Sequence, residues 1–317
     1  MIITILTEAG VGIGYGHLIR CRSLAFILKK NGHKVRFLVN GKGIPAPMID
    51  EETTIGEWLI DKDAIQSSIA DADITVVDSY LMSLEQASYI YSISRLVLWF
   101  DDTNRLSYPG GIILNPAWHS ERLYTKEDTR CHLLSGPLYQ QFREAFLDPP
   151  SYKINLKLRR VMVFLGGAPQ VKLNNQVAEE VKKIDPDIVC LHPIECSGQK
   201  KLGNVFLNDS DMRKAMESVD LIISGGGQIL AECIRTSIPT IAVEIAENQN
   251  LNITGWEEFG AVLNAGSPQS SIFLLNLQNS IKSLISQNQR RKLSDKASEG
   301  FDGLGGQRVT TFLERHV

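Results

Sequence analysis

The 317-residue sequence lacks any apolar run that approaches the ~20 residues needed to span a bilayer. It also lacks a dominant charge, because 33 Lys and Arg residues against 36 Asp and Glu residues leave a formal net charge of −3. That balance gives no electrostatic reason to expect nucleic acid or an anionic membrane as a partner. The apolar stretch at the amino terminus is short and is interrupted by glycines and Arg20, unlike a signal peptide. We therefore expect a cytoplasmic protein without membrane insertion.

Cysteine is scarce, and no two cysteines form a CxxC pair. The five cysteines are odd in number and scattered, which suits a reducing cytosol better than a disulfide framework. One stretch, CLHPIEC, carries Cys190, His192 and Cys196, but its spacing matches no common zinc pattern. We therefore expect no metal and no cofactor.

The chain is long for one hydrophobic core, so we expect two domains. It contains no short-period repeat and no low-complexity tract. Apolar, β-branched runs alternate with helix-like segments, a pattern typical of an α/β protein with parallel sheets. We expect strands at Ile2–Leu6, Lys34–Val39, Ile74–Val77, Leu96–Phe100, Arg160–Leu165, Leu221–Ile223 and Thr240–Val243, and helices at Leu18–Asn31, Asn174–Lys183, about 228–235 and Gly305–His316.

Two boundaries divide this pattern. The alternation breaks at Asp148-Pro149-Pro150, and the polar, basic stretch Ser151–Arg160 that follows is typical of an inter-domain linker. We therefore expect domains at 1–150 and 151–304, followed by an amphipathic helix in the tail 305–317.

The most informative stretch is GVGIGYGHLIRCRSLAFIL, residues 10–28, which joins the first expected strand to a helix. A dinucleotide-binding fingerprint needs G-x-G-x-x-G and an acidic residue at the end of the second strand. Here the glycines are spaced G-x-G-x-G-H, and the second strand ends in Asn40. A P-loop is disfavoured further, because no GK[ST] follows the glycines. The pattern indicates a glycine turn that presents His17 at the start of a helix.

The position of His17 suggests a general base. The positive end of the helix dipole disfavours imidazolium, so we expect His17 to be neutral near pH 7. A neutral imidazole can take a proton from water. The alternative is a histidine that only caps the helix or packs at the domain surface. Gly14 and Gly16 beside it let a ligand approach the backbone closely, which favours the functional interpretation.

A second glycine cluster, LIISGGGQILAE, places Gly225, Gly226 and Gly227 between a buried strand and a helix. Their backbone N–H groups, together with the helix N-terminus, are suited to a diphosphate. Glu232 lies four residues after Gln228 on the same helix face, where a carboxylate can accept both hydroxyls of a ribose. A plain strand-to-helix turn is the alternative, although three consecutive glycines are costly in chain entropy.

Polar side chains also follow other expected strands. Asp78 and Tyr80 lie just beyond Ile74–Val77, and Asn248 and Gln249 lie in the loop after a later strand. In parallel sheets, ligands bind beyond the carboxyl ends of the strands, so these residues can line a ligand site. The alternatives are an Asx-type turn at Asp78 and ordinary loop amides at Asn248 and Gln249.

These stretches resemble one known family. GYGHLIRCRSLA is similar to the G-x-G-H-x-x-R-C-x-x-L-A signature of the UDP-2,4-diacetamido-2,4,6-trideoxy-β-L-altropyranose hydrolases of pseudaminic acid biosynthesis. VVDSYLMS, FDDTNR, LLSGPLYQQFREAF, LGGAPQ, ISGGGQILAEC, AENQ and FDGLGGQRV resemble further segments of that family, in the same order. The resemblance covers nearly the whole chain.

The resemblance implies a glycosyltransferase B-type fold, with two Rossmann-like domains facing across a cleft and a last helix that crosses back to the first domain. It implies metal-independent hydrolysis of the sugar–diphosphate bond, with His17 as the base that activates water. It also implies that Tyr80 and Asn248 line the sugar and diphosphate region, whereas Gly226, Gly227 and Glu232 hold UDP.

Two positions depart from that family's pattern and leave the sugar open. Leu138 stands where the family usually has arginine, and LGGAPQ lacks an aspartate near its paired glycines. A related UDP-sugar, a glycosyltransferase of the same fold and a non-catalytic sugar-nucleotide-binding protein are the alternatives. We assign catalysis to His17, substrate binding to Gly14, Gly16, Arg20, Asp78, Tyr80, Asn248 and Gln249, and UDP binding to Gly225, Gly226, Gly227, Gln228 and Glu232.

Overall fold

The computed structural model describes residues 1–10, 12–124, 130–148, 152–166, 170–192 and 209–317. The chain forms two compact units. The first comprises Met1–Arg143 together with Leu304–Val317, and the second comprises Glu144–Gly303.

The first unit is built on a seven-stranded sheet in the order β3-β2-β1-β4-β5-β6-β7. Every neighbouring pair runs parallel, so the carboxyl ends of all its strands lie at one edge. The strands are β1 (Ile2–Glu8), β2 (Lys34–Asn40), β3 (Thr53–Ile55), β4 (Ile74–Asp78), β5 (Val97–Phe100), β6 (Gly111–Asn115) and β7 (Cys131–Ser135).

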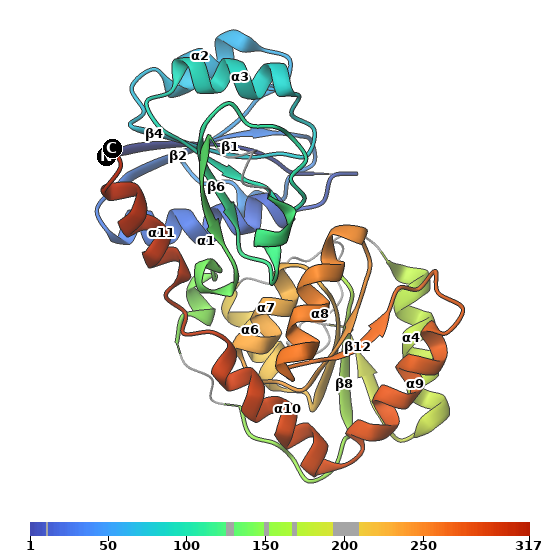
Figure 1. The fold of residues 1–317 in the computed structure, drawn as a ribbon. Helices are drawn as coiled ribbons and strands as arrows, with labels where there is room; N and C mark the ends of the chain where they lie inside the picture. Colours follow the sequence, from blue (N-terminus) through green and yellow to red (C-terminus); the bar gives the residue numbers. More distant parts are fainter. Residues whose placement is uncertain (11, 125–129, 149–151, 167–169, 193–208) are drawn as a thin grey trace. The chain divides into compact units, whose positions relative to one another are not determined.

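Helices cover both faces of this sheet (Figure 1). Alternate residues of β1 point to opposite faces: Ile3 and Ile5 pack with one set of core side chains, and Leu6 packs with another. The first set includes side chains of α1 (Gly16–Lys30) and α11 (Gly305–Glu314), and the second includes side chains of α2 (Lys62–Ile69) and α3 (Leu84–Ile93). Among its described residues the unit also contains the 3₁₀ turns η1 (Ala46–Met48), η2 (Ser120–Leu123) and η3 (Pro137–Tyr139).

The last helix, α11, packs against α1 of the first unit. Two glycines at its start permit the contact. A Cβ at Gly305 would lie 2.1 Å from the Gln140 carbonyl oxygen, and a Cβ at Gly306 would lie 2.9 Å from Cγ1 of Ile27. The expected return of the tail to the first unit is confirmed.

The second unit is built on a five-stranded parallel sheet in the order β12-β11-β10-β8-β9. The strands are β8 (Arg160–Phe164), β9 (Val189–Leu191), β10 (Leu221–Gly225), β11 (Thr240–Val243) and β12 (Leu263–Gly266). The helices are α4 (Val171–Ile184), α6 (Asp209–Glu217), α7 (Gln228–Arg235), α8 (Asn250–Phe259), α9 (Phe273–Leu284) and α10 (Gln287–Gly300), with 3₁₀ turns η4 (Glu144–Phe146) and η5 (Glu247–Gln249).

A buried arginine fixes the end of α7 within this unit. The Arg235 guanidinium donates hydrogen bonds to the carbonyl oxygens of Phe146 (3.0 Å), Leu147 (2.5 Å) and Phe301 (3.0 Å). A buried donor that loses its acceptor is costly in free energy, so breaking these bonds is unfavourable. The three bonds therefore hold α7 to the chain around η4 and to the chain just after α10.

The expected α/β architecture with two parallel sheets is confirmed, and each expected strand and helix is present, most of them with shifted ends. Strands β3, β6, β7, β9 and β12 were not expected. Most are short, and β12 (LNAG) has little of the β-branched composition that marks a strand.

Candidate active site

The loop between β1 and α1 forms a closed glycine turn. The Gly10 N–H donates to the Gly14 carbonyl (3.0 Å), and the Gly14 N–H donates back to the Gly10 carbonyl (2.9 Å). Gly12 and Gly14 have φ values of +87° and +89°, which glycine adopts without strain. The Gly14 N–H is therefore used inside the loop. Gly16, the first residue of α1, is exposed, with no atom within 4 Å of an added Cβ.

This turn places His17 in the first turn of α1, with only 9% of the residue exposed. Its Nδ1 lies 2.6 Å from Oδ1 of Asp78, the last residue of β4, which is fully buried. The strand register explains the approach, since β1 pairs with β4 and Thr7 lies opposite Asp78. The sequence prediction grouped His17 and Asp78 in one site, and the structure brings them together.

Charges around His17 fix which nitrogen can accept a proton. Burial would raise the pKa of Asp78, but Arg20 and His17 hold that pKa well below its usual range. Asp78 is therefore a carboxylate that only accepts hydrogen bonds. A neutral His17 must then carry its proton on Nδ1, which leaves the Nε2 lone pair as the basic site.

This contact reverses the direction expected for the pKa shift of His17. Burial lowers the pKa of His17, but the Asp78 carboxylate outweighs burial, and the pKa is raised from its usual value of 6.5. Arg20 opposes the rise and Glu8 adds to it. The helix dipole was expected to keep His17 neutral near pH 7, whereas the Asp78 carboxylate, 2.6 Å from Nδ1, acts in the other direction.

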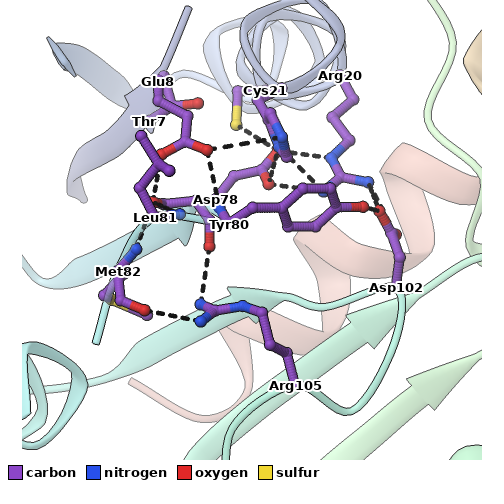
Figure 2. A network of polar contacts seen from close by, with 12 residues as sticks. Thr7, Glu8, Arg20, Cys21, Asp78, Tyr80, Leu81, Met82, Asp102 and Arg105 are labelled. Atoms are coloured by element: carbon purple, nitrogen blue, oxygen red, sulfur yellow. Dashed lines mark hydrogen bonds and ion pairs between the residues drawn. The ribbon is translucent and has the colours of Figure 1, made fainter. Parts of the chain in front are cut away.

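Arg20 lies one turn further along α1 and binds two carboxylates of the protein (Figure 2). Its Nε and Nη2 donate to the two oxygens of Asp78 at 2.5 and 2.6 Å. Its Nη1 donates to both oxygens of Asp102 at 2.8 and 2.7 Å. Arg20 was expected to bind substrate, whereas most of its donors are used within this network.

Tyr80 completes one side of this network. Its hydroxyl donates to Oδ2 of Asp102, and its ring meets the His17 ring edge-on, with centroids 4.5 Å apart. Burial and the Asp102 carboxylate raise the pKa of Tyr80 above its usual range, so it remains a phenol. Tyr80 is nevertheless 38% exposed, so part of its side chain is open to a ligand.

Sequence reasoning missed Glu8 as a site residue. Glu8 ends β1 and is 1% exposed. Its Oε1 lies 3.8 Å from Nε2 of His17 and accepts the Tyr80 N–H at 2.8 Å. Its Oε2 accepts the Ser79 hydroxyl. The available signal was an acidic residue at the end of a buried strand that leads directly into the glycine loop.

In the second unit, packing requires two of the three consecutive glycines. A Cβ at Gly225 would lie 2.5 Å from the Leu165 carbonyl oxygen, and a Cβ at Gly226 would lie 2.5 Å from Cδ1 of Ile253. Gly227, the N-cap of α7, is exposed, and the closest atom to an added Cβ is 3.8 Å away. The open space that suits a ligand therefore lies at Gly227.

Gln249 braces the glycine loop. Its Oε1 accepts hydrogen bonds from the backbone N–H groups of Gly226 and Ile245, both at 3.0 Å. The Gly226 N–H is thus used inside the unit, and the carbonyl end of Gln249 faces the loop. Asn248 is half-buried beside it in η5.

Helix α7 carries the remaining expected UDP residues. Gln228 is its first residue and is half-buried, whereas Glu232, one turn further, is only 1% exposed. The structure therefore brings Gln228 and Glu232 onto one helix next to Gly227, and the ribose role of Glu232 stays a prediction.

In the described ranges, no group of three or more His, Cys, Asp or Glu side chains is arranged to hold a metal ion. Of the CLHPIEC stretch, Cys196 lies outside the described residues, as do Gly167 of LGGAPQ and the prolines 149 and 150 of the expected linker. Likewise, none of the helices that the structure describes is long and apolar enough to cross a membrane.

A cavity of about 300 Å³ lies elsewhere in the first unit, lined by residues that include Tyr91, Arg95, Gly111 and His132. Tyr91 belongs to α3, but Arg95 precedes β5, Gly111 begins β6 and His132 lies at the start of β7. His17 and Asp78 lie instead at the edge where the strands end. Ligands of parallel sheets bind at the carboxyl edge, so we place the candidate site at His17 rather than in this cavity.

Comparison with known sequences gives distant relatives. No protein-family model matches the chain. An uncharacterised protein of Methanocaldococcus jannaschii is 25% identical over 269 residues, which cover 77% of this chain and 55% of that protein. A Helicobacter pylori protein is described as a pseudaminic acid cytidylyltransferase and UDP-2,4-diacetamido-2,4,6-trideoxy-β-L-altropyranose hydrolase. It is 23% identical over 270 residues, which cover 82% of this chain and 47% of that protein. The chain therefore spans about half the length of the curated relatives that it matches.

Solved structures show the fold. MurG of Acinetobacter baumannii superposes with a TM-score of 0.61 at 15% identity, covering 99% of both chains. The UDP co-structure of Staphylococcus aureus MnaA superposes with a TM-score of 0.61 at 12% identity, covering 96% of this chain and 94% of that chain. A glycosyltransferase of Streptomyces sp. SF2575, complexed with thymidine diphosphate, superposes with a TM-score of 0.59 at 12% identity, covering 99% of both chains. The chain has the glycosyltransferase B fold, as the family resemblance implied.

Proposed function

We propose that this protein is a UDP-sugar hydrolase in which His17 is the general base. One observation carries the proposal: Nδ1 of His17 is held by the buried Asp78 carboxylate at 2.6 Å, which leaves Nε2 as the basic atom. A base oriented by a carboxylate in this way is the arrangement that enzymes use to activate water.

The proposed reaction is attack of water on the anomeric carbon. A bond forms between the water oxygen and that carbon, and Nε2 of His17 takes the proton. The bond between the carbon and the diphosphate oxygen breaks, and its electron pair leaves with UDP. The leaving group needs no general acid, because a diphosphate is already a weak base. The products are UDP and the free sugar.

We assign UDP to the glycine loop of the second unit. Two features support this assignment: the open space at Gly227 and the N-terminus of α7, whose first N–H groups are suited to an anion. Similar folds also bind such ligands, since the S. aureus MnaA structure contains UDP. Gln228 and Glu232 follow on the same helix and supply polar groups for the nucleotide.

The sugar is proposed to be the 2,4-diacetamido-2,4,6-trideoxy-altrose of pseudaminic acid biosynthesis. The support is the resemblance to the hydrolase family together with the 23% identity to the Helicobacter protein. The fold alone is also compatible with transfer of the sugar to an acceptor hydroxyl, as in the glycosyltransferases that share it.

The test is incubation of the purified protein with UDP-2,4-diacetamido-2,4,6-trideoxy-β-L-altrose, followed by NMR of the released UDP. Release without any acceptor is the expected result. Strict dependence on an added sugar or lipid acceptor would identify a transferase instead. Binding without release in either mixture would identify a sugar-nucleotide-binding protein.

A further inference from the structure

The Arg20 guanidinium lies between two carboxylates that come from different strand ends. Asp78 ends β4 and accepts hydrogen bonds from Nε and Nη2 of Arg20. Asp102 follows β5, and both of its carboxylate oxygens accept hydrogen bonds from Nη1. The guanidinium also lies over the Phe100 ring, 5.0 Å from its centroid. A planar fork held by two carboxylates and an aromatic face has little freedom to reorient.

Each of these two carboxylates holds one further residue. Asp78 holds Nδ1 of His17. Asp102 accepts a hydrogen bond from the Tyr80 hydroxyl (Figure 2). The rings of His17 and Tyr80 then meet edge-on, with an interplanar angle of 87°. The contacts form a closed circuit: His17, Asp78, Arg20, Asp102, Tyr80 and back to His17.

We propose that Arg20 is a positioning residue, which sets the base His17 and the ring of Tyr80 in one fixed arrangement by holding Asp78 and Asp102. This inference rests on the proposed role of His17. It replaces the expected contact of Arg20 with substrate, and it explains why a cation lies between Asp78, which ends β4, and Asp102, which follows β5.

Arg20 also controls the charge that His17 experiences. The charged and titratable groups that face His17 are Asp78, Glu8 and Arg20, with Tyr80 and Cys21 in the same network. Arg20 lowers the pKa of His17, whereas Asp78 and Glu8 raise it. Without Arg20 only burial opposes Asp78 and Glu8, so His17 is protonated over a wider pH range and is less available as a base.

The test is an NMR titration of the His17 ring in protein labelled at histidine, with a His17→Ala spectrum for assignment. In Arg20→Gln, we expect the pKa of His17 to rise by about 1 unit relative to wild type. Arg22→Gln is the matched control. Arg22 lies on the same helix, but it donates to the Met48 carbonyl at 2.6 Å and does not face His17. A titration in Arg20→Gln that coincides with that of Arg22→Gln would overturn the proposal.

A second variant covers the case in which Arg20→Gln does not fold. Arg20→Lys keeps the positive charge, but a single ammonium group cannot donate to both carboxylates as a fork. We expect its His17 pKa to stay within about 0.5 unit of wild type, while kcat falls at least ~10-fold because the base and Tyr80 are no longer held together. Wild-type kcat in Arg20→Lys would contradict the positioning role.

The titration and the proposed hydrolysis fail in different ways. The titration uses no substrate, so it reports on Arg20 even if the sugar assignment is wrong. Full activity of His17→Ala would instead remove the base from the mechanism and leave the titration result intact.

Discussion

Two glycine turns of this protein follow buried parallel strands and lead into helices, yet their surroundings differ completely. The turn after β1 is surrounded by carboxylates, an arginine and a histidine. The turn after β10 is braced by the neutral amide of Gln249 and packs on Ile253. The first turn provides charged groups that can take part in proton transfer. The second turn provides backbone N–H groups at the start of α7 and open space at Gly227.

The difference shows that the glycines set shape, whereas neighbouring strand ends set chemistry. At the first turn, β1 and β4 end in Glu8 and Asp78. At the second turn, β10 ends in Gly225, and the adjacent strand β11 ends in Val243. The same local turn can therefore serve a base in one unit and, as we propose, a nucleotide in the other.

The largest expected effect is a loss of stability when a carboxylate beside the turn after β1 is removed. Asp78→Ala leaves Arg20 and His17 without their fully buried partner, so we expect the free energy of unfolding to fall by ~3–5 kcal/mol. Urea unfolding at pH 7 measures it. Glu51→Ala, which removes an exposed carboxylate, is the control and should change that free energy by under ~0.5 kcal/mol.

The same variant has a defined pH dependence. The pKa of Asp78 is lowered by folding, so its stabilisation is complete above its unfolded pKa of about 3.9 and is lost as the pH falls below that value. The difference between wild type and Asp78→Ala should shrink in acid. A difference that stays constant from pH 7 to below pH 3 would contradict the ion pair.

The next effect separates the two turns by function. His17→Ala should reduce turnover by ~10²-fold or more and leave UDP affinity nearly unchanged, because the base and the proposed nucleotide site belong to different turns. Turnover is followed by UDP release and affinity by calorimetry. His316→Ala, an exposed histidine near the end of the chain, is the control. Loss of UDP affinity in His17→Ala would break the division of roles.

A matched pair of glycine substitutions tests the turn after β10. Gly226→Ala forces a Cβ to within 2.5 Å of Ile253, so it should destabilise the second unit by ~1–3 kcal/mol and weaken UDP binding. Gly227→Ala places its Cβ in open space at a negative φ, so it should fold like wild type. Thermal unfolding compares the two variants. Equal effects would mean that packing does not distinguish these glycines.

The smallest effect is a shift in the pH profile. Only unprotonated His17 can accept a proton, and its pKa is raised, so kcat/KM should fall on the acid side with a midpoint above 6.5. For stability the sign is opposite to that of Asp78: the contribution of His17 is complete below its unfolded pKa and is lost as the pH rises through its folded pKa. A midpoint at or below 6.5 would contradict the effect of Asp78.

The fold was readable from the sequence because buried β-branched runs and glycine turns mark parallel strands directly. Thr240–Val243 was predicted with the bounds that the structure has. Two short strands were missed for different reasons: β12 (LNAG) contains no β-branched residue, and β3 (Thr53–Ile55) is β-branched but only three residues long.

The candidate site was readable only in part. Asp78 was suggested by its place after a strand, but its pairing with His17 depends on the register of β1 with β4. The place of Arg20 between Asp78 and Asp102 depends on residues 58 and 82 positions apart in the chain, and no local pattern predicts that arrangement. The pKa of His17 is raised rather than lowered, and that direction could not be read locally because it depends on a carboxylate brought close by the fold.

The most direct test of the central claim is hydrolysis of the UDP-sugar in H₂¹⁸O, with mass spectrometry of both products. Attack of His17-activated water on the anomeric carbon predicts one ¹⁸O atom in the freshly released sugar and none in UDP. Incorporation of ¹⁸O into UDP would place the attack at phosphorus and contradict the account.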